Sequence, residues 1–99
     1  MTHRVVFSKQ AQQDLTAIKA YIRRESSARI ANAFADALLD ACESLSKFPM
    51  RGSVHTEIGP AYRVVGFRHT VGIHFEADDS KVRILMLAYK GLNWPRPLR

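Results

Sequence analysis

The chain has 99 residues, enough for one domain with a single core and too few for two independently stable ones. It has no apolar run of the roughly 18 residues needed to cross a bilayer, no segment typical of a signal peptide, and a single cysteine, Cys42, so we expect a cytoplasmic protein without an internal disulfide. The formal net charge of +6 favours an acidic protein or a nucleic acid as partner.

The first predicted elements are a short strand and a helix. Val5–Phe7 is β-branched and aromatic, and the Ser8 hydroxyl that follows can cap a helix. A helix is predicted over residues 9–24 because apolar residues recur there at spacings of four, three and four, at Ala11, Leu15, Ile18 and Ile22. This apolar stripe needs a surface to pack against.

A second helix is predicted after Ser26 and Ser27, either of which can cap its first turn. The helical period then continues until Pro49 ends it, with apolar residues at Ile30, Phe34, Ala37, Leu38, Ala41, Leu45 and Phe48. Because the connection between the two helices is so short, we expect them to form an antiparallel hairpin.

Strands are predicted in the second half of the chain. Residues 50–60 contain two glycines and a proline without any period, which is typical of a surface loop. Three strand-like runs follow, at Tyr62–Phe67, Thr70–Glu76 and Val82–Tyr89, with a turn at residues 77–80. The predicted fold class is α+β in the order β-α-α-β-β-β, with the N-terminal strand and helical hairpin packed on a small, mainly antiparallel sheet.

The last strand is apolar on both faces. Simple alternation puts one set on each side of the sheet, with Val82, Ile84, Met86 and Ala88 on one face and Leu85, Leu87 and Tyr89 on the other. One helical hairpin covers only one face, so we expect a partner or the C-terminal tail to cover the second face.

The C-terminal end of the chain is basic. Residues 80–99 contain five basic side chains and no acidic one, and prolines at positions 95 and 97 preclude a helix there. We expect residues 91–99 to form an irregular tail of a single domain that spans residues 1–99. Trp94 either anchors a target protein, as tryptophan often does in interface hot spots, or caps the open end of the core.

No metal or cofactor site is predicted. The chain has no cysteine pair, and no two histidines have the helical spacing of metal ligands. His69 and His74 are five residues apart in or beside one strand, which sends their side chains to opposite faces, so we expect two separate surface or hairpin histidines. A ribonuclease would need a base, an acid and cations on the phosphate, and the sequence does not show that the suitable side chains converge: Arg63, Arg68, His69, Tyr89 and Lys90.

Several motifs in order resemble the ParE/RelE superfamily of toxins from type II toxin–antitoxin modules. The most specific is S-x-x-A-x-x-D-L-x-x-I-x-x-Y-I, which begins at Ser8 and is more similar to the ParE branch than to the RelE branch. Phe48-Pro49 before a glycine and the three closing strands extend the likeness from residue 4 to about residue 92.

The resemblance implies a compact toxin that a co-encoded, ParD-like antitoxin holds inactive by wrapping the hairpin and the sheet. In the ParE branch the free toxin is described as a poison of DNA gyrase that has no catalytic chemistry of its own. In the RelE branch the toxin cuts mRNA on the ribosome, and this remains the alternative. A homodimer or a hetero-oligomer with the antitoxin fits either branch, and a membrane partner fits neither.

The basic positions of the ribonuclease branch match this chain poorly, which favours the ParE branch. Arg63 matches one of them, but Val65 and Gly72 stand where two others are expected, and Lys90 is followed by glycine and leucine instead of a second basic residue. Direct contact with nucleic acid is therefore possible but not favoured.

The expected contact residues form two sets. The basic tail and sheet positions are expected to bind the target: Arg63, Arg68, Lys90, Trp94, Arg96 and Arg99. The apolar positions of the hairpin and last strand are expected to contribute to antitoxin binding: Leu15, Ile18, Tyr21, Ile22, Leu85 and Leu87. Some of the second set must instead belong to the core, and the sequence alone does not separate the two.

Overall fold

The structure, a computed structural model, describes residues 3–90 and 92. Its elements follow the predicted order with one added short strand: β1 (Arg4–Phe7), α1 (Lys9–Glu25), α2 (Ala28–Ser44), β2 (Ser53–Val54), β3 (Tyr62–Phe67), β4 (Val71–Ala77) and β5 (Lys81–Tyr89). The sheet order is β1-β5-β4-β3-β2, in which β1 runs parallel to β5 and the other neighbours are antiparallel. The predicted α+β class is confirmed.

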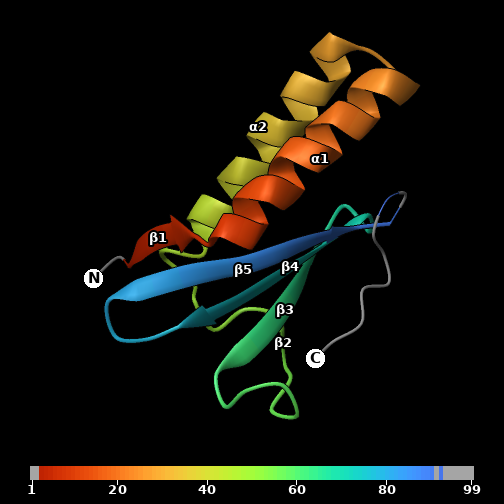
Figure 1. Cartoon of the computed structure of the whole chain (residues 1–99). Coiled ribbons are helices and arrows are strands. Elements are labelled where there is room, and N and C mark those ends of the chain that lie inside the picture. The colour runs from red at the N-terminus through yellow and green to blue at the C-terminus, as the bar shows by residue number, and fades with distance from the viewer. Residues whose placement is uncertain (1–2, 91, 93–99) are drawn as a thin grey trace.

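The two helices form an antiparallel hairpin that lies against one face of the sheet (Figure 1). Helix α1 lies over β5, and α2 packs on α1. Their apolar stripes meet the helix-facing side chains of β4 and β5 in one core, which consists of Ala11, Ile18, Ile22, Ala31, Leu38, Cys42, Leu45, Val71, Ile73, Phe75, Val82, Ile84 and Leu87. In the described part of the chain, neither helix is long and apolar enough to cross a membrane.

The segment after α2 differs from the prediction. The helix ends at Ser44 instead of continuing to Phe48, and Leu45 stays in the core from the cap position while Phe48 is 56% exposed. A two-residue strand, β2, then pairs with β3 inside the predicted loop. Gly52 has a φ of +80°, and a Cβ there would lie 2.3 Å from the Val64 carbonyl oxygen, so β2 comes this close only because residue 52 is a glycine.

Strand β5 contains a β-bulge, which makes the predicted faces of this strand wrong beyond Ile84. Phe75 of β4 pairs with Ile84, but His74 pairs with Met86, so Leu85 is skipped in the pairing with β4. One extra residue shifts the alternation, and the helix-facing set becomes Val82, Ile84, Leu87 and Tyr89. The opposite side of the sheet, here called the open face, is mixed rather than apolar and carries Gly72, His74, Glu76, Arg83, Met86 and Ala88.

Two polar residues of the motif that begins at Ser8, namely Ser8 and Asp14, form hydrogen bonds to β5 beside this bulge. The Ser8 hydroxyl accepts a hydrogen bond from the Ala11 N–H (3.0 Å) as the helix cap and donates one to the Leu85 carbonyl (2.7 Å). The Asp14 carboxylate, which is 4% exposed, accepts hydrogen bonds from the Leu87 N–H (3.0 Å) and from the Gln10 side-chain amide (2.9 Å). The motif therefore fastens α1 to β5 at the point where the strand loses its regular pairing.

Replacing Ser8 with alanine is expected to destabilise the protein by about 1–2 kcal/mol, because the variant loses the helix cap and leaves the Leu85 carbonyl without its hydroxyl donor. Ser27 provides a matched control, since its hydroxyl caps α2 at the Ile30 N–H (3.1 Å) and is exposed. Urea denaturation followed by circular dichroism compares the two variants. Equal losses for Ser8→Ala and Ser27→Ala would mean that the contact with the bulge contributes nothing.

Cys42 lies fully buried in the core, and burial, together with the nearby Glu43 carboxylate, raises the pKa of its thiol to about 12. Since the thiolate is the reactive form, the native protein is expected to resist a thiol reagent such as DTNB at pH 8. Labelling should become fast in denaturing urea, so its rate reports unfolding. Rapid labelling under native conditions would show that the core opens locally around α2.

Candidate interaction site

The six residues predicted to bind the antitoxin separate into core and surface. Ile18, Ile22 and Leu87 are 1%, 7% and 0% exposed and belong to the core, so they are not available to a partner in this structure. Leu15, Tyr21 and Leu85 are half-buried. The apolar stripe of α1 thus mixes residues that hold the sheet with residues at the edge of the helix–sheet contact.

The six residues predicted to bind the target are also divided. Arg63 lies near the start of β3 on the helix side of the sheet, where its Nη1 donates to the Met50 carbonyl (2.9 Å). Arg68 lies beyond the other end of β3, at the same end of the sheet as Lys90, whose backbone N–H donates to the Thr70 carbonyl (2.8 Å). The structure thus places Arg68 and Lys90 at one end of the sheet and Arg63 toward the other. The remaining three lie outside the described residues: Trp94, Arg96 and Arg99.

Four half-buried aromatic rings meet at the Arg68 end of the sheet, and we call them the turn-end cluster: Tyr21, Phe34, Phe67 and Tyr89. Phe34 of α2 contacts Phe67 and Tyr89 edge-to-face, with ring centroids 5.5 and 5.9 Å apart. Tyr21 of α1 contacts Tyr89 in the same way at 5.7 Å. Both helices and two strands are therefore joined at this end by aromatic contacts.

Two arginines lie on the faces of these rings. The Arg68 guanidinium carbon is 4.9 Å from the Phe67 ring centre and 5.9 Å from that of Phe34. The Arg24 guanidinium carbon is 5.7 Å from the Tyr21 ring centre. Arg68 and Arg24 are exposed, so each combines a ring contact with access to solvent.

The turn that carries Arg68 has an uncommon backbone. Arg68 and His69 both have positive φ, +51° and +59°, and the Thr70 N–H closes the turn on the Phe67 carbonyl at 3.0 Å. Positive φ at both central residues is the pattern of a type I′ turn, for which asparagine and glycine are the preferred residues. An Arg-His pair between two strand-like runs was visible in the sequence and was the signal that could have singled out this turn.

The two strand histidines differ from the prediction. His69 is an exposed hairpin residue, as expected, but His74 is only 4% exposed and lies on the open face. Its Nδ1 is 3.0 Å from the Tyr62 hydroxyl, and the two rings meet edge-to-face at 5.7 Å. Expecting a surface position for His74 was wrong because the middle strand of the sheet is buried on both faces. Within residues 3–90 and 92, no three His, Cys, Asp or Glu side chains are grouped to hold a metal ion.

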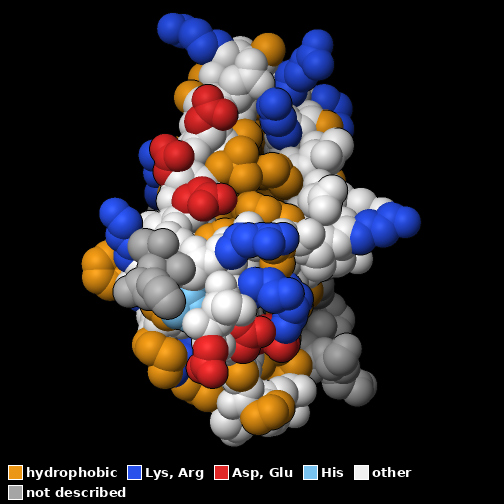
Figure 2. Space-filling model, turned by 90° about the vertical axis from the view of Figure 1, so that its left-hand side faces the viewer, with side chains coloured by type: hydrophobic (Ala, Val, Ile, Leu, Met, Phe, Trp, Pro, Cys, Tyr) orange, Lys and Arg blue, Asp and Glu red, His pale blue; other side chains and the backbone are white. Residues whose placement is uncertain are grey.

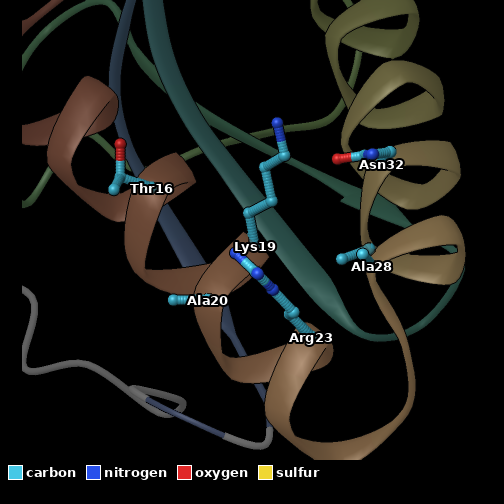
Figure 3. A pocket seen from close by; sticks show the side chains of 7 residues that line it. Thr16, Lys19, Ala20, Arg23, Ala28 and Asn32 are labelled. Carbon is cyan, nitrogen blue, oxygen red and sulfur yellow. The ribbon is translucent and has the colours of Figure 1, made fainter.

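The outer side of the hairpin has a shallow groove of about 510 Å³ between the helices. Figure 3 shows Lys19 and Arg23 on α1 and Asn32 on α2 beside it, and small side chains, among them Ala28 and Ala31, also line the groove. Exposed carboxylates follow one face of α2, at Asp36, Asp40 and Glu43. Figure 2 shows acidic side chains in a row on the α2 side of an apolar seam. The outer hairpin is thus basic on α1 and acidic on α2.

Comparison with known proteins identifies the family to which the chain belongs. Residues 5–89 match the family described as the ParE toxin of the type II toxin–antitoxin system parDE. A solved structure titled "Chromosomal ParDE TA system from P. aeruginosa" is similar in fold, with a TM-score of 0.76 over 89% of this chain and 96% of that chain, at 15% sequence identity. No match was found among curated proteins. The chain belongs to the ParE toxin family of type II toxin–antitoxin systems.

Proposed function

We propose that this ParE-family toxin inhibits DNA gyrase by direct binding in the cytoplasm, without catalysis of its own, and that a cognate antitoxin neutralises it. The family match supports the toxin role. The choice of gyrase rests on the resemblance to the ParE branch.

The observation that carries the non-catalytic reading is the distribution of the candidate cations. Arg68 and Lys90 are exposed at the turn end of the sheet, whereas Arg63 lies toward the other end of β3 and donates to the backbone of the loop after α2. A ribonuclease would need its cations around one scissile phosphate. This arrangement favours an extended contact with another macromolecule.

Antitoxin binding is proposed at the half-buried positions of the helix–sheet edge, Leu15, Tyr21 and Leu85. These apolar side chains are open to a partner, while Ile18, Ile22 and Leu87 support them from the core. A partner that neutralises a chain of net charge +6 is expected to be acidic. The toxin and antitoxin are proposed to form a hetero-oligomer.

A supercoiling assay tests the proposed target. Purified gyrase, relaxed plasmid and ATP are mixed with the toxin, and the DNA products are separated after denaturation. Loss of supercoiling together with accumulation of linear DNA is expected, because a poison traps the cleaved complex. Normal supercoiling in the presence of folded toxin would contradict gyrase as the target, and adding the purified antitoxin should restore activity if the inhibition is specific.

A ribosome-dependent ribonuclease is the second candidate, and the Tyr62–His74 pair favours it. The Tyr62 hydroxyl and the His74 Nδ1 are 3.0 Å apart on the open face. On the same face Glu76 of β4 stands opposite Arg83 of β5 in the strand register. Against it, His74 is buried and therefore poorly placed to reach an RNA 2′-hydroxyl. Incubating the toxin with translating ribosomes and mapping mRNA ends decides this alternative, since cleavage would appear without any effect on gyrase.

A further inference from the structure

The Arg68–His69 turn has a backbone conformation that is unfavourable for these two residues and that asparagine and glycine adopt more easily. Non-glycine residues rarely adopt positive φ, and here two consecutive residues, one of them a long arginine, do so. Strain of this kind persists where the surrounding structure enforces it, and it is concentrated at functional sites. At this turn it directs the Arg68 guanidinium onto the faces of Phe67 and Phe34.

The cations around the turn-end cluster have no acidic partner in the described part of the chain. No Asp or Glu carboxylate within residues 3–90 and 92 lies within 4.0 Å of the charged groups of Arg24, Arg68 or Lys90. Arg68 and Arg24 are instead held by ring contacts, which fix the planes of their guanidinium groups and leave the N–H edges free. Such pre-ordered guanidinium edges match carboxylates, which bind them through paired hydrogen bonds.

The ring contacts also argue against nucleic-acid bases as the occupant. Bases bind aromatic side chains by stacking on their faces. Here Arg68 lies on the faces of Phe67 and Phe34, Arg24 lies on the face of Tyr21, and the rings contact one another edge-to-face, so these ring faces are already in use. What the surface offers is guanidinium groups bordered by half-buried aromatic rings, a composition typical of protein–protein hot spots.

We propose that the turn-end cluster, with Arg24, Arg68 and Lys90, is the docking surface for an acidic segment of the protein on which the toxin acts, with carboxylates binding the two guanidinium groups. The inference rests on the proposed function, because gyrase is taken as the protein on which the toxin acts. It assigns the binding to the strained turn rather than to the basic tail alone, and Arg24 becomes a contact residue that the sequence did not indicate.

Two variants of the turn separate binding from folding. Arg68→Asn with His69→Gly gives the turn its preferred residues and removes the guanidinium group, so the double variant should be at least as heat-stable as the wild type. His69→Gly alone relieves the backbone strain and keeps Arg68, so it is the matched control. Lys9→Glu tests general electrostatics, because Lys9 is exposed and lies about 22 Å along α1 from Arg24.

Affinity for purified gyrase holoenzyme, melting temperature and growth arrest of bacterial cells expressing each variant are the readouts. We expect the double variant to bind gyrase about tenfold more weakly or worse despite an unchanged or raised melting temperature, while His69→Gly and Lys9→Glu stay within about threefold of the wild type. Wild-type affinity in the double variant would overturn the proposal. The proposal would also be overturned if the double variant bound gyrase like the wild type but no longer bound a labelled single-stranded RNA that the wild type binds. That result would assign the surface to nucleic acid.

Failure of the proposed target is distinguishable from failure of this surface. If the wild-type toxin does not bind gyrase but arrests growth, gyrase is wrong, and the variants are compared by growth arrest. Arrest by His69→Gly and not by the double variant would support the docking surface, whereas arrest by both would overturn it. If the wild-type toxin neither binds gyrase nor arrests growth, the proposed function and this inference both fail.

Discussion

Deleting Leu85 is expected to destabilise the protein by about 3–5 kcal/mol while leaving the fold in place. Leu85 is the extra residue of the β5 bulge, and without it the alternation of β5 continues unbroken. Ile84, Leu87 and Tyr89 would still face the helices, and Met86 and Ala88 would still lie on the open face, because the residue removed is the unpaired one. The cost arises at the contact with α1, because the Ser8 hydroxyl loses the Leu85 carbonyl as its acceptor and a straightened β5 shifts the Leu87 N–H away from the Asp14 carboxylate.

The comparison that isolates the effect of the bulge is Leu85→Ala. This variant keeps the residue count of the bulge and truncates a half-buried side chain, so we expect a loss of only about 1–2 kcal/mol and a cooperative unfolding transition. Urea denaturation followed by circular dichroism compares the two proteins, and a well-dispersed amide NMR spectrum is expected for both. Equal stabilities of the two variants would mean that the bulge contributes nothing beyond the Leu85 side chain.

Replacing Asp14 with alanine is expected to destabilise the protein by about 2–4 kcal/mol, the largest effect of any single polar substitution considered. The carboxylate is nearly fully buried and accepts the Leu87 N–H, a backbone donor two residues after the extra residue of the bulge. The substitution removes this buried acceptor from the core. A loss of this size corresponds to a fall of roughly 10 °C or more in melting temperature for about 100 residues.

Two further variants serve as controls for Asp14→Ala, one at an exposed aspartate and one that keeps a side-chain oxygen at position 14. Asp36→Ala on the exposed face of α2 should change stability by less than about 0.5 kcal/mol. Asp14→Asn keeps an acceptor for Leu87 but loses the charge, so it should fall between the wild type and Asp14→Ala. Urea denaturation at pH 7 compares the series. Similar stabilities for Asp14→Ala and Asp36→Ala would contradict a structural role for the buried carboxylate.

The elements that were predictable from sequence are those with a local signal. The spacing of Ala11, Leu15, Ile18 and Ile22 specifies α1, and Ser8 caps it as predicted. The order of elements and the antiparallel hairpin follow from such local patterns. Strand β2 carries no such pattern, because two residues pair there only through backbone atoms and a close approach at Gly52.

The bulge was not predictable because alternation along a strand is counted from its own residues, whereas the extra residue is defined by pairing with β4. The same limit applies to the candidate site. Ile18 and Leu15 belong to one apolar stripe, yet one is buried by the sheet and the other lies at its edge. The turn-end cluster comes from both helices and two strands, so its proximity depends on the tertiary fold.

The parallel pairing of β1 with β5 has a consequence for how the toxin is made in the cell. Val5 pairs with Val82 and Phe7 with Ile84, so the first strand finds its partner only after more than three quarters of the chain has been synthesised. Until then the apolar stripe of α1 has no sheet to cover it. A chain that ends before β5 therefore lacks both the partner strand of β1 and the surface that covers α1, and it is not expected to fold.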